Sequence, residues 1–534
     1  MHLRLAQINP TVGDIAGNLE LVKEAWKSAP QRTDLVISPE LVVCGYPPLD
    51  LLNEESFISS CMEAVQKLAA EFPGHPPLLL GCPWILEEKP FNAAVLLHKG
   101  KVQKVFTKRF LPNYDVFDEK RYFTEGQHET VLHLENGLCL ITICEDLWAS
   151  NPGQLLQESM YSASSLSAII NLSASPFAYN QQQYREQAIG KFSKEANALV
   201  AYCNQVGANT ELIFDGRSGL YGESGPVSHT LSFTAECIDV TLPASSDPLP
   251  TGQKSNEPSL WEKEVINALI LGIQDYFKKL NLKQALLGLS GGLDSALVAY
   301  LASKALGAEN VLAVLMPSEY SSKHSINDAL ALAKNLGIST KEIPIKSSLA
   351  TLTDALPAKL STLTQENLQA RTRGLLLMAL ANEENRILLN TSNKSEVAVG
   401  YTTIYGDMCG GLSIIGDVWK TQAYQLAHYI NRNQEIIPKE ILLKPPSAEL
   451  RPNQTDADEL PDYEHLDPFL IEIIEEGKTL ASCQTQTLSE KDQERVYQLI
   501  ERSEWKRFQS PPILRVSDKA FGQGRRIPIA KRRS

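Results

Sequence analysis

Short runs of apolar residues alternate, in the first half of the chain, with longer stretches in which apolar residues recur every three or four positions. The first pattern is typical of buried strands and the second of amphipathic helices, so this half is predicted to be α/β. The predicted strands are Leu3–Ile8, Leu35–Ser38, Leu78–Gly81, Ala93–Leu97, Leu138–Cys144, Ala168–Leu172 and Ala198–Cys203.

The second half shows the same two patterns in regular succession. The predicted elements are a helix at Leu260–Lys279, a strand at Gln284–Leu289, a helix at Asp294–Leu306, a strand at Val311–Met316 and a helix at Ser322–Leu336. A series in which helices separate successive strands favours a doubly wound parallel sheet.

A break rich in proline and serine separates the two halves at residues 243–259. Such a segment has too few apolar residues to bury a core, so it is predicted to be a linker between domain 1–242 and domain 260–534. Residues 444–462, inside the second domain, are rich in proline and acidic residues and are predicted to form a mobile loop.

The composition is that of an ordinary folded protein. The 534 residues suit two or three domains, and 43% of them are hydrophobic and 21% charged. With 63 acidic and 50 basic residues the net charge is −13, so the chain lacks the broad basic field that holds nucleic acid. A nucleic-acid partner is therefore not expected.

The chain also lacks the signals of secretion and of membrane insertion. No apolar run reaches the roughly 18 residues that span a bilayer, and the N-terminus opens with a strand pattern where a signal sequence would stand. Nine scattered cysteines without a Cys-x-x-Cys pair argue against a disulfide framework and a structural zinc site. We predict a cytoplasmic protein that does not bind membranes.

A glycine-rich turn follows the first predicted strand of the second domain. Residues 288–295 read Gly-Leu-Ser-Gly-Gly-Leu-Asp-Ser and lead into a helix. Glycines allow a close approach of the backbone, and the free N–H groups at a helix start attract negative oxygens. Asp294 would repel a bare phosphate, so a divalent cation is expected between them. The alternative is a plain glycine-rich turn with a helix cap.

Ser-Gly-Gly-x-Asp-Ser resembles the pyrophosphate loop of the N-type ATP pyrophosphatases, which split ATP into AMP and pyrophosphate. Four later segments are similar, in order and spacing, to the NAD synthetase branch of that family. They are Glu366–Gly374, Thr391–Glu396, Tyr405–Asp407 and Lys420-Thr421.

This resemblance implies a set of site residues. Asn367, Arg371 and Asp407 would bind deamido-NAD⁺, and Asp294 and Glu396 would hold Mg²⁺. Taken singly, Arg371 and Glu396 would more often be members of surface ion pairs. The residues implied for ATP are Gly288, Ser290, Gly291, Gly292, Asp294, Ser295, Thr391 and Lys420.

A cysteine stands at the end of a predicted strand in the first domain. Strand residues 138–143 run directly into Cys144, where a turn begins. A neighbouring cation or a helix N-terminus can lower a thiol's pKa and make it a nucleophile. The alternative for an isolated cysteine is a small buried hydrophobic residue. Glu40 at another strand end and Lys108 before a Leu-Pro corner favour the nucleophile.

Glu40, Lys108 and Cys144 resemble the triad of the nitrilase superfamily, whose fold is an α-β-β-α sandwich. The resemblance covers residues 1–242 and includes the patterns at 7–14 and 117–123. It implies that Glu40 acts as the base, that Lys108 stabilises the oxyanion, and that Cys144 forms a thioester and releases ammonia.

The same resemblance implies further roles in binding glutamine. Glu119 would orient Lys108, and Tyr114 and Ser175 would help to form the pocket for the amide substrate. Relatives often carry a basic residue six positions after the serine that corresponds to Ser175, where this chain has Gln181. The group that binds the carboxylate of glutamine is therefore left open.

The chain as a whole resembles the glutamine-dependent NAD⁺ synthetases, in which one domain makes ammonia and the other consumes it. The implied ligands are glutamine, deamido-NAD⁺, Mg²⁺ and ATP as a co-substrate, and the implied assembly is a homo-oligomer of two or more subunits. Three alternatives remain. They are a different amide-forming or RNA-modifying ATP pyrophosphatase, an amidase whose second domain senses a nucleotide, and a scaffold without activity.

Overall fold

The computed structural model describes residues 1–127, 130–156, 161–162, 165–243, 248–252, 260–357, 359–452 and 454–531. The chain divides into two compact units, Met1–Ser259 and Leu260–Ser534. Of the predicted linker, residues 244–247 and 253–259 lie outside the described residues. No helix of the described part is both long enough and apolar enough to cross a membrane.

Unit 1 contains two six-stranded sheets. The first has the order β14-β1-β2-β3-β4-β5 and consists of β14 (Glu236–Thr241), β1 (His2–Gln7), β2 (Leu35–Ile37), β3 (Leu78–Leu86), β4 (Lys89–His98) and β5 (Lys101–Thr107). The second has the order β13-β12-β9-β8-β7-β6 and consists of β13 (Gly225–His229), β12 (Gly219–Gly222), β9 (Val200–Asn204), β8 (Ala168–Ser173), β7 (Gly137–Ile143) and β6 (Val131–Leu134). A two-stranded hairpin pairs β10 (Val206–Asn209) with β11 (Leu212–Asp215).

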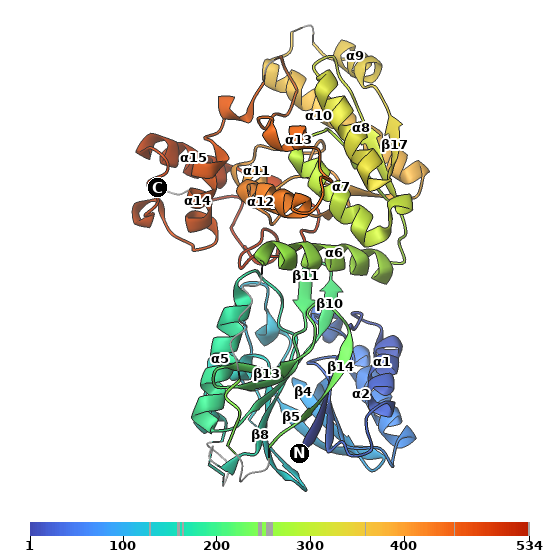
Figure 1. Cartoon of the computed structure of the whole chain (residues 1–534), viewed down its shortest axis with the longest axis vertical. Helices are drawn as coiled ribbons and strands as arrows, with labels where there is room; N and C mark the ends of the chain where they lie inside the picture. The colour runs from blue at the N-terminus through green and yellow to red at the C-terminus, as the bar shows by residue number, and fades with distance from the viewer. Residues whose placement is uncertain are drawn as a thin grey trace. The chain divides into compact units, whose positions relative to one another are not determined.

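Helices cover the outer faces of the two sheets (Figure 1). Alternate residues of a strand point to opposite faces, and β2 shows the result: Leu35 and Ile37 pack between the sheets, whereas Val36 packs with the helices. Unit 1 is thus the predicted α-β-β-α sandwich. Its helical segments are α1 (Ile15–Lys27), η1 (Leu49–Asn53), α2 (Glu55–Glu71), η2 (Glu119–Arg121), α3 (Glu145–Ala149), α4 (Pro152–Leu155) and α5 (Gln181–Ala196).

Unit 2 is built on a five-stranded parallel sheet with the order β17-β16-β15-β18-β19. Its strands are β15 (Ala285–Gly288), β16 (Val311–Leu315), β17 (Ser339–Glu342), β18 (Ile387–Asn390) and β19 (Leu412–Ser413). The strand order reverses between β15 and β18, and in doubly wound sheets ligands bind beyond the carboxyl ends of the strands at this point. The predicted doubly wound sheet is confirmed.

The helices of unit 2 continue the predicted pattern, with Leu377 and Ala381 of α10 packed on Leu286 and Val314 of the sheet. The five elements predicted at the start of this unit agree with the structure to within two residues at each end. The helical segments are α6 (Trp261–Lys279), α7 (Leu293–Leu306), η4 (Ala308–Asn310), α8 (Lys323–Leu336), α9 (Lys346–Asp354), α10 (Thr362–Glu383), α11 (Lys394–Val399), α12 (Lys420–Asn431), α13 (Lys439–Leu443), η5 (Asp456–Asp458), α14 (Tyr463–Ile474), η6 (Leu480–Ser482), α15 (Glu490–Arg502) and α16 (Glu504–Arg507).

A buried lysine joins α11 to the last part of the chain. The side chain of Lys394 is 0% exposed, and its Nζ lies 2.6 Å from Glu475 Oε1 and 2.8 Å from Asp417 Oδ1. The same Nζ donates to Ser517 Oγ at 2.8 Å and to the Lys519 carbonyl at 2.9 Å. Since a buried ammonium is tolerated only where its charge and its protons are satisfied, these contacts fix the C-terminal segment against α11.

We predict that Lys394→Ala lowers the free energy of unfolding of unit 2 by about 3–5 kcal/mol, because Asp417 and Glu475 would lose the buried cation between them. Urea unfolding monitored by tryptophan fluorescence measures this loss. The control Lys439→Ala removes an exposed lysine that lies 3.7 Å from Glu435, and should change the free energy by less than about 0.5 kcal/mol. A loss of that small size in Lys394→Ala would contradict the assignment.

Candidate active sites

Cys144 lies at the turn between β7 and α3. Its φ of +43° belongs to the left-handed region, which residues other than glycine rarely adopt. The backbone N–H of Cys144 donates to the Leu172 carbonyl at 2.8 Å, which ties the turn to the end of β8. Strained backbone of this kind is concentrated at functional sites, where the surrounding structure holds one side chain in a fixed position.

A lysine lies between two carboxylates in the interior of unit 1. Lys108 Nζ donates to Glu40 Oε1 at 2.7 Å and to both carboxylate oxygens of Glu119 at 2.9 Å. Burial disfavours the ammonium, but the two carboxylates outweigh burial and raise the pKa of Lys108 well above its usual value. Burial, together with repulsion from Glu40, raises the pKa of Glu119 to about 7 despite the attraction of Lys108.

Three residues that the sequence did not single out hold these carboxylates. Asn92 Nδ2 donates to Glu40 Oε1 at 2.7 Å and to Glu119 Oε2 at 3.3 Å. The Ala174 N–H donates to Glu40 Oε2 at 3.0 Å, and the Tyr46 hydroxyl donates to Glu119 Oε1 at 3.0 Å. Asn92 is in the middle of β4 and Ala174 follows β8, so no local motif connects them with Glu40.

Asp146 braces the two loops that carry Lys108 and Cys144. Its buried carboxylate accepts the backbone N–H groups of Arg109 and Phe110, each at 2.9 Å, and that of Ile143 at 2.9 Å. The loop after β5 is therefore fixed to the turn after β7. Nothing in the sequence distinguished Asp146 from the other acids, because its partners are backbone groups.

The thiol of Cys144 has acidic neighbours as well as a cation. Burial raises its pKa well above the usual range, and Glu40 raises it further, while Lys108 opposes both effects. The thiol is therefore protonated at neutral pH. Its activation requires a base that takes the proton as the sulfur attacks, and Glu40 is a buried carboxylate that acts on this thiol.

The predicted glutamine-pocket residues lie around the same strand ends. The Tyr114 hydroxyl donates to Glu145 Oε2 at 3.0 Å, and the N–H of Ser175 donates to Asn204 Oδ1 at 2.9 Å. Gln181 begins α5. Arg185, one turn later in α5, is engaged by Asp215 at 2.9 Å and is 1% exposed, so it does not supply the basic group that is absent at Gln181.

We predict that Glu40→Gln lowers the pKa of the Cys144 thiol, because the variant removes the negative charge that disfavours the thiolate. The rate of alkylation of Cys144 by iodoacetamide, followed by mass spectrometry across pH, should then rise at lower pH than in the wild type. Glu63→Gln, an exposed change on α2, should leave the profile unchanged. A profile displaced to higher pH in Glu40→Gln would contradict this electrostatic account.

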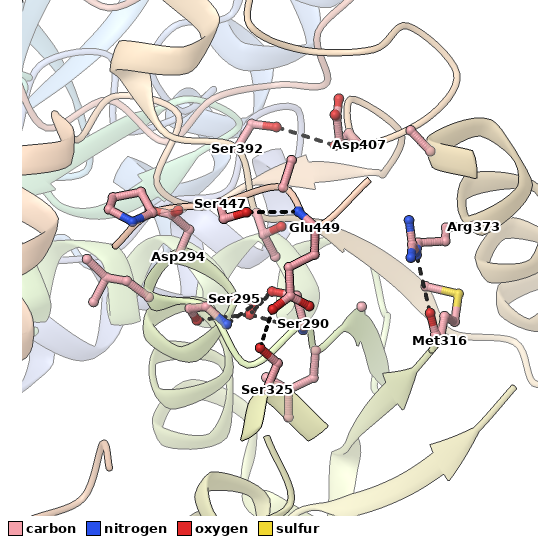
Figure 2. Close-up of a pocket in the computed structure, with 18 of the residues that line it drawn as sticks. Ser290, Asp294, Ser295, Met316, Ser325, Arg373, Ser392, Asp407, Ser447 and Glu449 are labelled. Atoms are coloured by element: carbon pink, nitrogen blue, oxygen red, sulfur yellow. Dashed lines mark hydrogen bonds between the residues drawn. The ribbon is translucent and has the colours of Figure 1, made fainter. Parts of the chain in front are cut away.

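Unit 2 contains a cavity of about 330 Å³ at the carboxyl ends of β15, β16 and β18 (Figure 2). The Ser-Gly-Gly turn lies on one side of it. Gly291 has a φ of +77°, and a Cβ at this position would lie 2.1 Å from the Ser325 carbonyl oxygen, so only glycine fits. Ser290 Oγ and Ser295 Oγ lie 3.0 Å apart, and the Gly292 N–H donates to Ser290 Oγ at 3.2 Å.

Charged groups of both signs meet on another side of the cavity. Lys420 Nζ lies 2.5 Å from Asp294 Oδ2 and 3.9 Å from Glu396 Oε1. Asn393 Nδ2 also donates to Asp294 Oδ1 at 3.2 Å. Burial and the nearby Asp294 raise the pKa of Glu396 well above its usual value, while Lys420 opposes them.

Most of the residues predicted for ATP and deamido-NAD⁺ line this cavity. Asn367 and Arg371 do not. Asn367 Oδ1 accepts from Thr403 Oγ1 at 2.7 Å, and Arg371 Nε donates to the Ile404 carbonyl at 3.2 Å. Gly291 is also absent from the lining. The predicted residues that line it are Gly288, Ser290, Gly292, Asp294, Ser295, Thr391, Glu396, Asp407 and Lys420.

Asp407 lines the cavity and also contacts Thr403, the residue that donates to Asn367. Its carboxylate accepts the Thr403 N–H at 2.7 Å, and burial raises its pKa to about 6. Lys506, which the sequence did not single out, opposes that rise and donates to the Gly400 and Thr402 carbonyls at 2.7 Å.

Sequence reasoning also missed two lining residues that carry opposite charges. Arg373 of α10 lines the cavity where Arg371 was expected, and its Nε donates to the Met316 carbonyl at 3.3 Å (Figure 2). Glu449 lies in the segment 444–462, and residues 444–450 line the cavity. The available signal was helical spacing. Residues two apart on a helix face different sides, so Arg371 and Arg373 are not expected to line the same cavity.

Comparison with known proteins also separates the chain into two parts. Residues 2–246 match the carbon-nitrogen hydrolase family and residues 265–510 match the NAD synthase family. The glutamine-dependent NAD(+) synthetase of Synechocystis is 44% identical over 99% of this chain and 98% of its own length, and that of Thermotoga maritima is 40% identical over 100% and 99%.

A solved structure extends the similarity to three dimensions. The glutamine-dependent NAD⁺ synthetase of Acinetobacter baumannii, in complex with ADP, is 32% identical, covers 99% of this chain and 98% of its own, and has a TM-score of 0.76. Both matched families, the full-length relatives and this structure point to one enzyme family. The chain belongs to the glutamine-dependent NAD⁺ synthetases.

Proposed function

We propose that this chain hydrolyses glutamine in unit 1 and uses the ammonia in unit 2 to convert deamido-NAD⁺ to NAD⁺, with ATP split into AMP and pyrophosphate. The observation that carries this proposal is the presence of two complementary sites in a chain that matches such enzymes from end to end. One is a buried Glu–Lys–Cys group, and the other is a cavity formed by a Ser-Gly-Gly turn.

In unit 1, Glu40 takes the proton of the Cys144 thiol as the sulfur attacks the amide carbon of glutamine. Lys108, held by Glu40 and Glu119, donates to the oxygen on which negative charge develops. The C–N bond then breaks, the proton on Glu40 goes to the leaving ammonia, and a thioester remains. Water activated by Glu40 hydrolyses the thioester to glutamate.

In unit 2, the carboxylate of deamido-NAD⁺ attacks the α-phosphorus of ATP and pyrophosphate leaves. Ammonia then attacks the acyl carbon, AMP leaves and one proton of the ammonia is released, which gives the amide. The N–H groups and hydroxyls of the Ser-Gly-Gly turn suit the phosphates of ATP, and Lys420 supplies a positive charge beside them. Asp407, Asn367 and Arg371 stay assigned to deamido-NAD⁺ by resemblance.

The carboxylates of Asp294 and Glu396 suit a Mg²⁺ ion. Mg²⁺ prefers oxygen ligands and is commonly held by one or two carboxylates together with substrate phosphates. Within the residues that the structure describes, no group of three or more His, Cys, Asp or Glu side chains comes together to hold a metal. When bound, the ion would offset negative charge on the phosphates of ATP.

Three further expectations stay predictions. Segment 444–462, apart from residue 453, is described and lines the cavity in part, and we propose that it closes over ATP during turnover. The homo-oligomer and the cytoplasmic location rest on resemblance and on composition.

Cys144→Ala is predicted to abolish NAD⁺ formation from glutamine and to retain it with ammonium salt, because the adenylation site does not use the thiol. NAD⁺ is measured with each nitrogen donor. Cys237→Ala, a thiol on β14, should retain both activities. If Cys144→Ala were equally inactive with ammonium, the division of chemistry between the two units would be wrong.

Asp294→Asn and Glu396→Gln are each predicted to lower the rate of AMP release by about 10³-fold or more, since the lost charge stabilisation is worth several kcal/mol. AMP is measured with deamido-NAD⁺ present and absent, and glutamine hydrolysis is measured separately and should persist.

Glu342→Gln, an exposed carboxylate change on β17, serves as the control for both variants. Full AMP release in Asp294→Asn or Glu396→Gln would remove that residue from the site. AMP release that does not depend on deamido-NAD⁺ would favour a different ATP pyrophosphatase.

A further inference from the structure

The carboxylate of Glu449 lies inside the cavity of unit 2, at the start of α8 (Figure 2). Glu449 Oε1 accepts from Ser325 Oγ at 2.6 Å, and Oε2 accepts the Ser322 N–H at 3.4 Å. Lys444 Nζ donates to the same Ser325 Oγ at 3.1 Å. A hydroxyl and a backbone N–H thus donate to one carboxylate, with an ammonium bound to the same hydroxyl, and these donors equally suit a phosphate.

This carboxylate lies next to the turn that is assigned to the phosphates of ATP. The Ser325 carbonyl oxygen is packed directly against Gly291, where a Cβ would approach it to 2.1 Å. Ser290, Ser295, Ser325 and Glu449 all line the cavity, and Figure 2 shows the Glu449 carboxylate pointing toward the serines of the turn. The starts of α7 and α8 therefore face the same space, and Glu449 occupies part of it.

The charged residues that line the cavity also suit a phosphate at the position of the Glu449 carboxylate. Arg373 lines the cavity opposite Glu449 (Figure 2). Burial lowers the pKa of its guanidinium, and Glu449 is the carboxylate that opposes this effect. Arg373 and Lys444, the latter also 3.7 Å from Asp328 Oδ2, both line the cavity, so Glu449 supplies negative charge among two cations, as the phosphates of ATP would.

The backbone of the segment holds Glu449 in this orientation. Glu449 has a φ of +48°, and its N–H donates to Ser447 Oγ at 3.1 Å. The following N–H, of Leu450, donates to Gln454 Oε1 at 2.8 Å. A non-glycine residue in the left-handed region costs about 1–3 kcal/mol, so contacts of the segment and of the carboxylate offset that strain.

We propose that Glu449 is a built-in competitor of ATP: its carboxylate takes the place of a phosphate while no nucleotide is bound, and leaves when the triphosphate enters. Two anions cannot share the same donors, and they repel each other at short range in a partly buried site. Entry of ATP then displaces the Glu449 carboxylate from its contacts at the start of α8, after which the segment closes over the bound nucleotide. The inference rests on the proposed function, since it takes the cavity to be the ATP site.

The test is the affinity for ATP, measured by isothermal titration calorimetry on the full chain without glutamine or deamido-NAD⁺. Glu449→Gln keeps the size of the side chain and an acceptor for Ser325, but it removes the charge. If the Glu449 carboxylate occupies the phosphate position about nine-tenths of the time, only about one-tenth of the molecules are free to bind ATP. The variant should then bind ATP about tenfold more tightly. Pyrophosphate should gain by a similar factor, and adenosine, which has no phosphate, should not.

Glu459→Gln is the matched control, because Glu459 is an exposed acid of the same segment outside the cavity lining. It should change none of the three affinities. Unchanged or weaker binding of ATP by Glu449→Gln would overturn the proposal, and so would an equal gain for adenosine, which would indicate a general opening of the segment. Failure of the wild type to bind ATP would instead overturn the proposed function.

Discussion

A lysine ammonium that is buried away from water must be paired with carboxylates, and the arrangement of unit 1 around Lys108 follows from this requirement. Its side chain is fully buried, so Glu40 and Glu119 must both reach it, and Asn92, Tyr46 and the Ala174 N–H must in turn satisfy their oxygens. These partners come from both sheets. The buried charge therefore fixes the ends of several strands relative to one another, and Glu40 and Lys108, which we propose as base and oxyanion donor, are positioned as a consequence.

Unit 2 also has to pair buried charges, once around Lys394 and once in the cavity that contains Lys420 and Glu449, and the results differ. Around Lys394 every partner is part of the protein and the contact is closed to solvent, so the outcome is structural. Around Lys420 and Glu449 the charges line a cavity, and in our proposal the nucleotide takes the place of the Glu449 carboxylate there. The difference between a structural ion pair and a binding site is thus whether the surrounding space can admit another charged group.

The separation of the two units also suits their chemistry. A thiol nucleophile needs a dry interior with one base, and Cys144 lies among buried groups. Phosphate chemistry needs donors at helix starts and open space for a large ligand, which the loops at the strand-order reversal between β15 and β18 provide. Each fold offers one of these environments, and one chain joins them.

The sequence by itself determined the alternation of strands and helices, the doubly wound sheet of unit 2 and the segments that carry Cys144 and the Ser-Gly-Gly turn, because hydrophobic period and turn residues are properties of neighbouring positions. For unit 1 the periodicity predicted only an α/β fold, and the sandwich was implied by the resemblance to the nitrilase superfamily. Tertiary structure alone decided that Asn92 and Asp146 brace the thiol site, that Arg373 and not Arg371 lines the cavity, and that Glu449 enters it. The reason is physical. Each of these depends on contacts between segments far apart in the chain, and such contacts are set by packing and by the pairing of buried charge.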